Sequence, residues 1–180
     1  MFDDDEKKTK VRVLKKITPT RLKNIALYYL KRFETTSAGL RQVLRKRIND
    51  YAYQNKEFDL SEAYGWADEI ISDFERYGYV NDERFAEMKI RDYAAAGKSM
   101  RYIRGKLREK GVSEEVISRL SEAQAYDEEE AALKLARKKR IGRFRNEEQR
   151  AEYRQKDMAA LARAGFSYDI AQKICADDEF

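Results

Sequence analysis

Residues 77–86 read Tyr-Gly-Tyr-Val-Asn-Asp-Glu-Arg-Phe-Ala, and their order predicts the end of one helix and the start of the next. Gly78 can adopt the left-handed conformation that closes a helix. Asn81 is a preferred N-cap residue, and the carboxylates of Asp82 and Glu83 are favourable at the positive end of the helix it opens. Two helices therefore meet here across a short junction.

Signals for helix starts recur on both sides of this junction. Capping residues predict starts at Thr18 (with Pro19 at the first helical position), Ser37, Asp59 (with Glu62), Asn81, Ser99, Ser113, Asp127, Asn146 and Ser167. Helix ends are predicted at Gly78, Gly97, Lys110-Gly111, Ile141, Ala164 and Ala176. The chain has only one proline and eight isolated glycines, so we predict an all-α fold.

Apolar residues recur every three or four positions along these helices, as expected for helices with one buried face. The first predicted inward stripe is Leu22, Ile25, Ala26, Tyr29 and Phe33, and that of the third helix is Trp66, Ile70, Phe74 and Tyr77.

Internal similarity predicts a repeat. Residues 111–113 and 165–167 both read glycine, apolar residue, serine, at an offset of 54 positions, and Leu40 and Leu44 match Ile103 and Leu107 at an offset of 63. We predict three tandem three-helix repeats that form an elongated, curved molecule, because small helical units need stacked neighbours to bury enough surface. The repeats span 18–78, 79–124 and 125–180 after a basic tail, 1–17. The alternative is a single nine-helix globule.

Composition narrows the class of protein. Histidine is absent and Cys175 is the only cysteine, which removes His-dependent catalysis and nearly all zinc ligand sets. There is no glycine-rich phosphate loop, no membrane-spanning apolar run and no signal peptide. We predict a cytoplasmic binding protein that is not an enzyme and needs no cofactor or metal. A carboxylate enzyme using Asp68 and Asp73 has little support, and Cys175 is predicted to be a packed thiol.

Lys and Arg number 38 against 33 Asp and Glu, but they are concentrated in three runs. Residues 7–32 hold ten cations and no acid, 98–110 hold six against Glu109, and 134–145 hold seven and no acid. In the middle run Arg101, Arg104 and Arg108 share one helix face, opposite Ile103 and Leu107. Aromatic residues beside these cations, Tyr51, Tyr53, Tyr102 and Phe144, are candidate anchors. Each of these features is also explained by an ordinary solvated face or by core packing.

The ten-residue junction resembles that of the RecX family, bacterial regulators of the RecA recombinase. Residues 97–112 resemble that family's helix ending in Lys-Gly, 26–44 its first repeat, and 165–167 the start of its last helix. The first repeat departs from the family pattern, since Arg47-Ile48 stand where Lys-Gly is expected. The stretch 49–58 then either lengthens the second helix or forms a loop.

The resemblance implies a non-enzymatic, monomeric regulator of DNA repair and the SOS response. It would bind in the groove of the RecA–single-stranded DNA filament and inhibit filament extension, recombination and coprotease activity. Candidate partner-binding residues are Lys15, Lys16, Arg21, Lys98, Arg101, Arg104, Arg108, Lys110, Lys138, Lys139, Arg140, Arg143 and Arg145. Structural roles at the repeat junction are expected for Gly78, Tyr79, Asn81, Asp82, Arg84 and Phe85. The alternative is sequence-independent nucleic-acid binding by the cationic helices.

Overall fold

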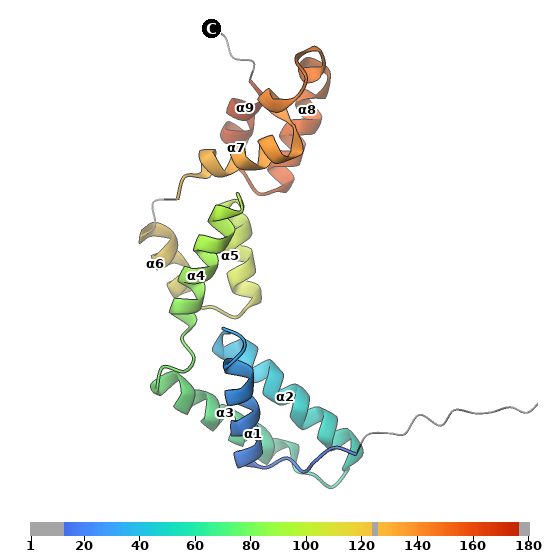
Figure 1. Cartoon of the computed structure of the whole chain (residues 1–180), viewed down its shortest axis with the longest axis vertical. Coiled ribbons are helices and arrows are strands. Elements are labelled where there is room, and N and C mark those ends of the chain that lie inside the picture. Colours follow the sequence, from blue (N-terminus) through green and yellow to red (C-terminus); the bar gives the residue numbers. More distant parts are fainter. Residues whose placement is uncertain (1–12, 124–125, 177–180) are drawn as a thin grey trace, which may run out of the picture. The chain divides into compact units, whose positions relative to one another are not determined.

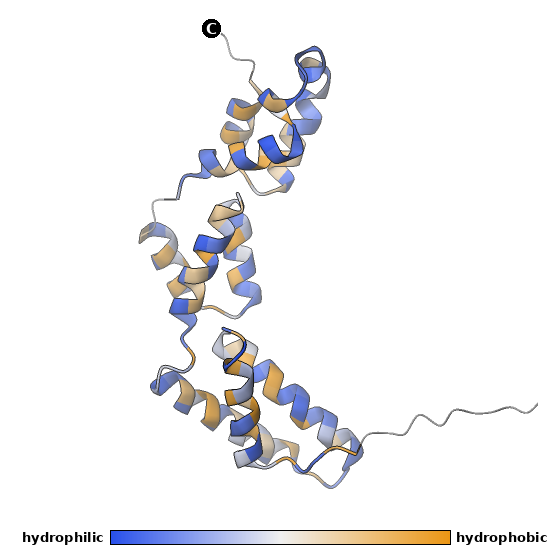
Figure 2. Cartoon of the chain, in the orientation of Figure 1, coloured by the Kyte–Doolittle hydropathy of each residue, from blue (hydrophilic) through white to orange (hydrophobic). Residues whose placement is uncertain are grey.

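The computed structural model describes residues 13–123 and 126–176, and these form nine α-helices, one short 3-10 helix and no strand (Figure 1). They divide into two compact units. Unit 1 comprises residues 13–33 and 40–79, and unit 2 comprises 34–39, 80–123 and 126–176. The helices observed in these residues confirm the prediction of an all-α fold. Hydrophobic and hydrophilic residues are mixed along them (Figure 2).

Unit 1 contains α1 (Pro19–Leu30), most of α2 (Ser37–Gln54) and α3 (Leu60–Arg76). Thr18 caps α1 by accepting a hydrogen bond from the Arg21 amide, and Asp59 caps α3 in the same way. Helix α1 packs on α3. The buried hydrophobic residues of this unit are Ile17, Leu22, Ala26, Leu40, Leu44, Ile48, Ala63, Ala67, Ile70, Ile71 and Phe74.

Two predicted members of the inward stripes lie on the surface instead. Phe33 is 54% exposed, because α1 ends at Leu30 and the stripe does not continue beyond the helix. Tyr77 is the C-cap of α3 and is 66% exposed, whereas Ile71 occupies the buried face. Residues 49–58 were expected either to lengthen the second helix or to form a loop. The first alternative holds as far as Gln54, where α2 ends.

Unit 2 contains two helical triplets. The first is α4 (Asp82–Ala95), α5 (Met100–Glu109) and α6 (Glu114–Ala123). Its core is formed by Phe85, Ala86, Ile90, Ile103, Leu107, Val112, Ile117 and Leu120. Asn81 and Ser99 cap α4 and α5 through their side chains, as predicted.

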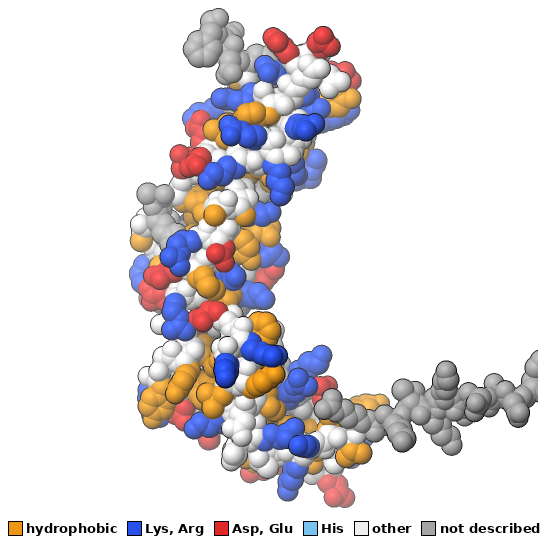
Figure 3. Space-filling model, in the orientation of Figure 1, with side chains coloured by type: hydrophobic (Ala, Val, Ile, Leu, Met, Phe, Trp, Pro, Cys, Tyr) orange, Lys and Arg blue, Asp and Glu red, His pale blue; other side chains and the backbone are white. Residues whose placement is uncertain are grey.

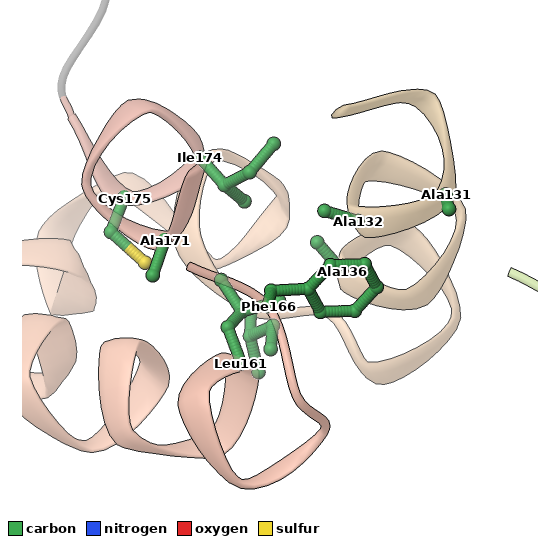
Figure 4. Packing of buried hydrophobic residues seen from close by; sticks show 9 residues of the cluster. Ala131, Ala132, Ala136, Leu161, Phe166, Ala171, Ile174 and Cys175 are labelled. Carbon is green, nitrogen blue, oxygen red and sulfur yellow. The ribbon is translucent and has the colours of Figure 1, made fainter. Parts of the chain in front are cut away.

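The second triplet is α7 (Glu128–Lys139), α8 (Glu147–Arg163) and α9 (Tyr168–Cys175). A short 3-10 helix at Gly142–Phe144, between α7 and α8, was not predicted from the sequence. Phe166 lies between the alanines of α7 and Leu161 of α8, while Ile174 and Cys175 pack from α9 (Figure 4). Burial raises the pKa of the Cys175 thiol, in keeping with a packed residue. Tyr126 packs against the cores of both triplets, and desolvation raises its pKa to about 12.

One hydrogen-bonded arrangement occurs twice within unit 2, and we call it the hydroxyl joint. In the first copy the Thr36 hydroxyl donates to the carbonyl of Lys110, the C-cap of α5, at 2.5 Å. In the second copy the Ser99 hydroxyl donates to the carbonyl of Ala164, the C-cap of α8, at 2.7 Å. Both donors are buried, so the joint also satisfies polar groups that water cannot reach.

A second bond completes each copy of the joint. The Ser37 amide donates to the carboxylate of Asp82 at 2.7 Å, and the Met100 amide donates to that of Glu128 at 3.0 Å. Asp82 and Glu128 are both the first residue of a helix. The offsets of 54 and 63 residues in the sequence therefore correspond to a repeated pattern of hydrogen bonds.

Glycine allows the close approach in both copies. Gly111 and Gly165 follow the carbonyl acceptors and have φ of 79° and 95°, a region that favours glycine. A Cβ atom on Gly111 would overlap Ala38, and one on Gly165 would overlap the Ser99 hydroxyl. The shared Gly-apolar-Ser pattern thus has a steric cause.

Candidate partner-binding surface

The three arginines predicted to form a ridge on α5 do lie together. Arg101, Arg104 and Arg108 line one open hollow of about 410 Å³, together with Met100 and Glu128. Arg101 is exposed, and no carboxylate of the described residues pairs with it. The hollow can therefore accept an anionic group, although Glu128 stands at one side of it.

The other two arginines have side-chain partners within unit 2, a carboxylate for Arg108 and a hydroxyl for Arg104. Arg108 forms a two-pronged pair with Glu114, with both N–O distances 2.7 Å, and these hydrogen bonds lower the pKa of the Glu114 carboxyl. The Nε atom of Arg104 donates to the Ser121 hydroxyl at 3.3 Å. Because the Arg108 pair is exposed, a competing anion can replace Glu114 at small cost.

Tyr102 lies half-buried beside this ridge. Its ring meets Tyr93 edge-on with centroids 5.6 Å apart, and the ammonium groups of Lys98 and Lys106 lie 5.0 and 5.7 Å from the ring centre. Lys110 is exposed while its carbonyl belongs to the hydroxyl joint. In the middle basic run, Arg101, Arg108 and Lys110 are thus exposed, whereas Lys98, Arg104 and Lys106 are half-buried and Lys106 pairs with Glu109.

The third basic run divides into exposed and structural residues. Lys138, Lys139 and Arg140 are exposed at the C-terminal end of α7, where cations are favourable. Arg143 is half-buried and donates to the Lys173 carbonyl at 2.9 Å. Phe144, a predicted anchor, packs against the α7–α9 core and lies 5.2 Å beneath the Arg137 guanidinium.

Arg145 is an internal ion-pair partner. It forms two hydrogen bonds of 2.7 and 2.8 Å with Asp157, and their side chains are only 20% and 4% exposed. Burial acts to raise the pKa of Asp157, but the hydrogen bonds from Arg145 and the Gly142 amide outweigh it, so the pKa is lowered. This geometry gives Arg145 a structural role in unit 2 and leaves it little freedom to meet a partner.

Unit 1 carries the basic residues of the first run. Lys15 and Lys16 are exposed and Arg21 is half-buried, while Lys7, Lys8, Lys10 and Arg12 lie outside the described residues. Arg32 lies 4.8 Å above the exposed ring of Tyr28. Of the predicted anchors in this unit, Tyr53 is 79% exposed and Tyr51 packs edge-on against Phe58. On the face drawn in Figure 3, Lys and Arg are interspersed with Asp and Glu over both units.

The junction residues have local partners. Gly78 has a φ of 73°, and the Tyr79 ring, 56% exposed, lies 5.2 Å from that of Phe74. In unit 2, Phe85 is buried and Arg84 pairs with Glu34 at 2.7 Å. With Asn81 capping α4 and Asp82 in the hydroxyl joint, each residue has an observed conformational or packing role.

Within residues 13–123 and 126–176, both carboxylates considered for catalysis have arginine partners. Asp68 pairs with Arg41 and Arg45, and Asp73 pairs with Arg76. No group of three or more metal-ligating side chains occurs there. Nor does any helix of this part combine the length and hydropathy needed to cross a bilayer.

Comparison with known proteins adds a family relationship. Residues 81–119 match the family described as RecX, second three-helix domain, and residues 127–175 match RecX, third three-helix domain. The chain is 42% identical over 163 residues to the regulatory protein RecX of Myxococcus xanthus, covering 89% of this chain and 87% of that protein. It is 30% identical over 156 residues to the regulatory protein RecX of Agrobacterium fabrum, covering 86% and 81%.

Proposed function

Because the chain belongs to the RecX family, we propose that it regulates the RecA recombinase by binding the RecA–single-stranded DNA filament. In this proposal it binds as a monomer in the cytoplasm, in the filament's helical groove, and opposes filament extension, recombination and coprotease activity. Its helices act as three triplets, 18–78, 79–124 and 125–180. The observation that carries the proposal is the similarity to regulatory proteins along nearly the whole chain.

The α5 hollow is the best supported contact site. It lies within the stretch that matches the family, and it presents three arginines on one helix face. Exposed ion pairs contribute only about 0.2–1 kcal/mol each. Several contacts along a repetitive filament would therefore have to act together, with each bound contact raising the effective concentration of the next.

Charge reversal tests this site. We expect the triple variant Arg101→Glu, Arg104→Glu and Arg108→Glu to lose inhibition of filament-dependent ATP hydrolysis, because repulsion replaces attraction across the hollow. The matched control reverses Arg91, Arg154 and Arg163, three exposed arginines of unit 2 outside this hollow. Circular dichroism checks that both variants keep their helicity. Full inhibition by the first variant, or equal loss in both, would remove the hollow from the binding site.

Direct DNA binding is the second candidate. It is favoured by the exposed ring of Tyr28 in α1, a helix without acids, and by Arg32, which follows the helix and lies over that ring. Naked single-stranded DNA and RecA-coated DNA should be titrated in parallel at several salt concentrations. Direct binding predicts that the logarithm of the affinity for naked DNA falls linearly with the logarithm of the salt concentration. The slope should be about −0.7 for each phosphate contacted. Tight binding to the coated strand alone supports the regulator.

A further inference from the structure

Unit 1 contains a hollow of about 620 Å³ that is separate in sequence and in lining from the α5 contact site. It lies between the segment preceding α1, the first turns of α1 and the second half of α2. Its apolar lining comes from Leu14, Ile17 and Ile25, and the rings of Tyr28 and Tyr51 border it. It is large enough for one or two side chains of a bound segment.

Three cations line the same hollow. Lys15 and Arg47 are exposed and Arg21 is half-buried, and none of them forms an ion pair with a carboxylate of the described residues. The Nε atom of Arg21 is buried, and it has no hydrogen-bond partner in the described part of the chain. A buried donor without an acceptor costs about 1–3 kcal/mol, so an arriving acceptor has a specific place to bind.

We propose that this hollow is a docking site for an acidic peptide segment of a partner protein, with an apolar side chain flanked by carboxylates. The apolar side chain lies among Leu14, Ile17 and Ile25. A flanking carboxylate accepts hydrogen bonds from Arg21, and Lys15 and Arg47 attract the others. The site belongs to unit 1, whereas the α5 residues belong to unit 2, and it does not depend on the α5 contact site.

The lining favours a peptide over a nucleic acid. Asp50 also lines the hollow, and its carboxylate can accept a hydrogen bond from a peptide N–H, a donor that a sugar-phosphate backbone lacks. Thr18, Thr20 and Asn24 supply further partners for peptide groups. The aliphatic floor suits a Phe or Leu side chain, whereas single-stranded nucleic acids bind by stacking on exposed aromatic faces.

Fluorescence anisotropy with the full chain tests the proposal. The probe is a fluorescein-labelled peptide, Asp-Asp-Phe-Asp-Asp, compared with Asn-Asn-Phe-Asn-Asn and Asp-Asp-Ser-Asp-Asp. Saturable binding of the first peptide, and binding of each of the others weakened by about tenfold, is expected if apolar and charged groups both contribute. Equal binding of the serine peptide would reduce the site to general charge attraction and overturn the proposal, as would absence of saturable binding.

Variants then locate the site. Arg47→Gln should weaken binding of the acidic Phe peptide by about three- to fivefold, as expected for loss of one exposed ion pair. Lys46→Gln makes the same charge change one position away, on an exposed residue that does not line the hollow, and should change the affinity less than about twofold. Tyr28→Ser removes part of the wall without changing charge and should also weaken binding. Equal effects at positions 46 and 47, or a short oligodeoxythymidylate that binds more tightly than the peptide and depends on Arg47, would contradict the assignment.

Discussion

Asp157 accepts three hydrogen bonds in the interior of unit 2, two from Arg145 and one from the Gly142 amide. It ties α8 to the segment that follows α7, where the chain turns through its 3-10 helix. Burial of a carboxylate is unfavourable unless such partners are present, and here they are strong enough to lower its pKa.

At the residue scale we predict that Asp157→Asn lowers the free energy of unfolding by about 2–3 kcal/mol at pH 7, because Arg145 loses its charged partner. A carboxyl whose folded pKa lies below its ordinary value of 3.8 stabilises the protein above that value. The difference from the wild type should therefore shrink as pH falls from about 4 through the folded pKa. Urea titrations at several pH values measure this. The control Glu152→Gln, an exposed acid of α8, should change stability by less than about 0.5 kcal/mol.

Sequence patterns identified the charged residues of the candidate site but not their partners. Arg145 is one of seven cations in an acid-free run, and Asp157 stands in a strongly charged helix, so neither position signals a buried pair. The same limit applies to Arg108 and Glu114. Whether a cation is free depends on tertiary geometry, and periodicity carries no information about that.

At the element scale, two glycines of unit 2 have opposite roles. Gly165 has a positive φ and no room for a Cβ atom, whereas a Cβ atom on Gly105, inside α5, would meet nothing within 4 Å. We predict that Gly165→Ala destabilises the protein by about 1–3 kcal/mol. Gly105→Ala should instead stabilise it by about 0.5–1 kcal/mol, because alanine restricts the unfolded chain and favours helix. Thermal melts of both variants decide this, and a stabilising Gly165→Ala would contradict the described joint.

Helix boundaries were predictable because they depend on local chemistry. Thr18, Asp59, Asn81, Ser99, Asp127 and Ser167 all act as side-chain N-caps. Errors occurred where a stripe was continued past the end of a helix, as at Phe33 and Tyr77. Asn146 does precede α8 as predicted, but its side chain makes no capping hydrogen bond. The 3-10 helix was missed because it is held by Asp157, 15 residues beyond Gly142.

At the scale of the whole molecule, the all-helical class was confirmed, while the elongated, curved shape and the three-repeat boundaries stay predictions. The described residues form two compact units. Residues 34–39 belong to unit 2, although they lie within the first predicted repeat, 18–78. This assignment follows from the hydroxyl joint, since Thr36 and Ser37 bond to Lys110 and Asp82. No local signal at Thr36 could have predicted it.

Because each unit has its own core, a core substitution in one unit should destabilise that unit more than the other. Ile71 is buried in unit 1, and Ile71→Ala should cost about 2–5 kcal/mol through the cavity it leaves. Amide hydrogen exchange should then show a much larger loss of protection in α1 and α3 than in α8 and α9. A uniform loss across both units would indicate that the chain unfolds as one cooperative body.

The hydroxyl joint also bears on how such a chain could evolve. Each copy needs only a hydroxyl and an amide at the start of one helix, a carboxylate at the start of another, and a glycine after a carbonyl. A duplicated triplet carrying these few groups would be compatible with its neighbours from the outset. Selection could then lengthen or shorten the array without inventing a new interface.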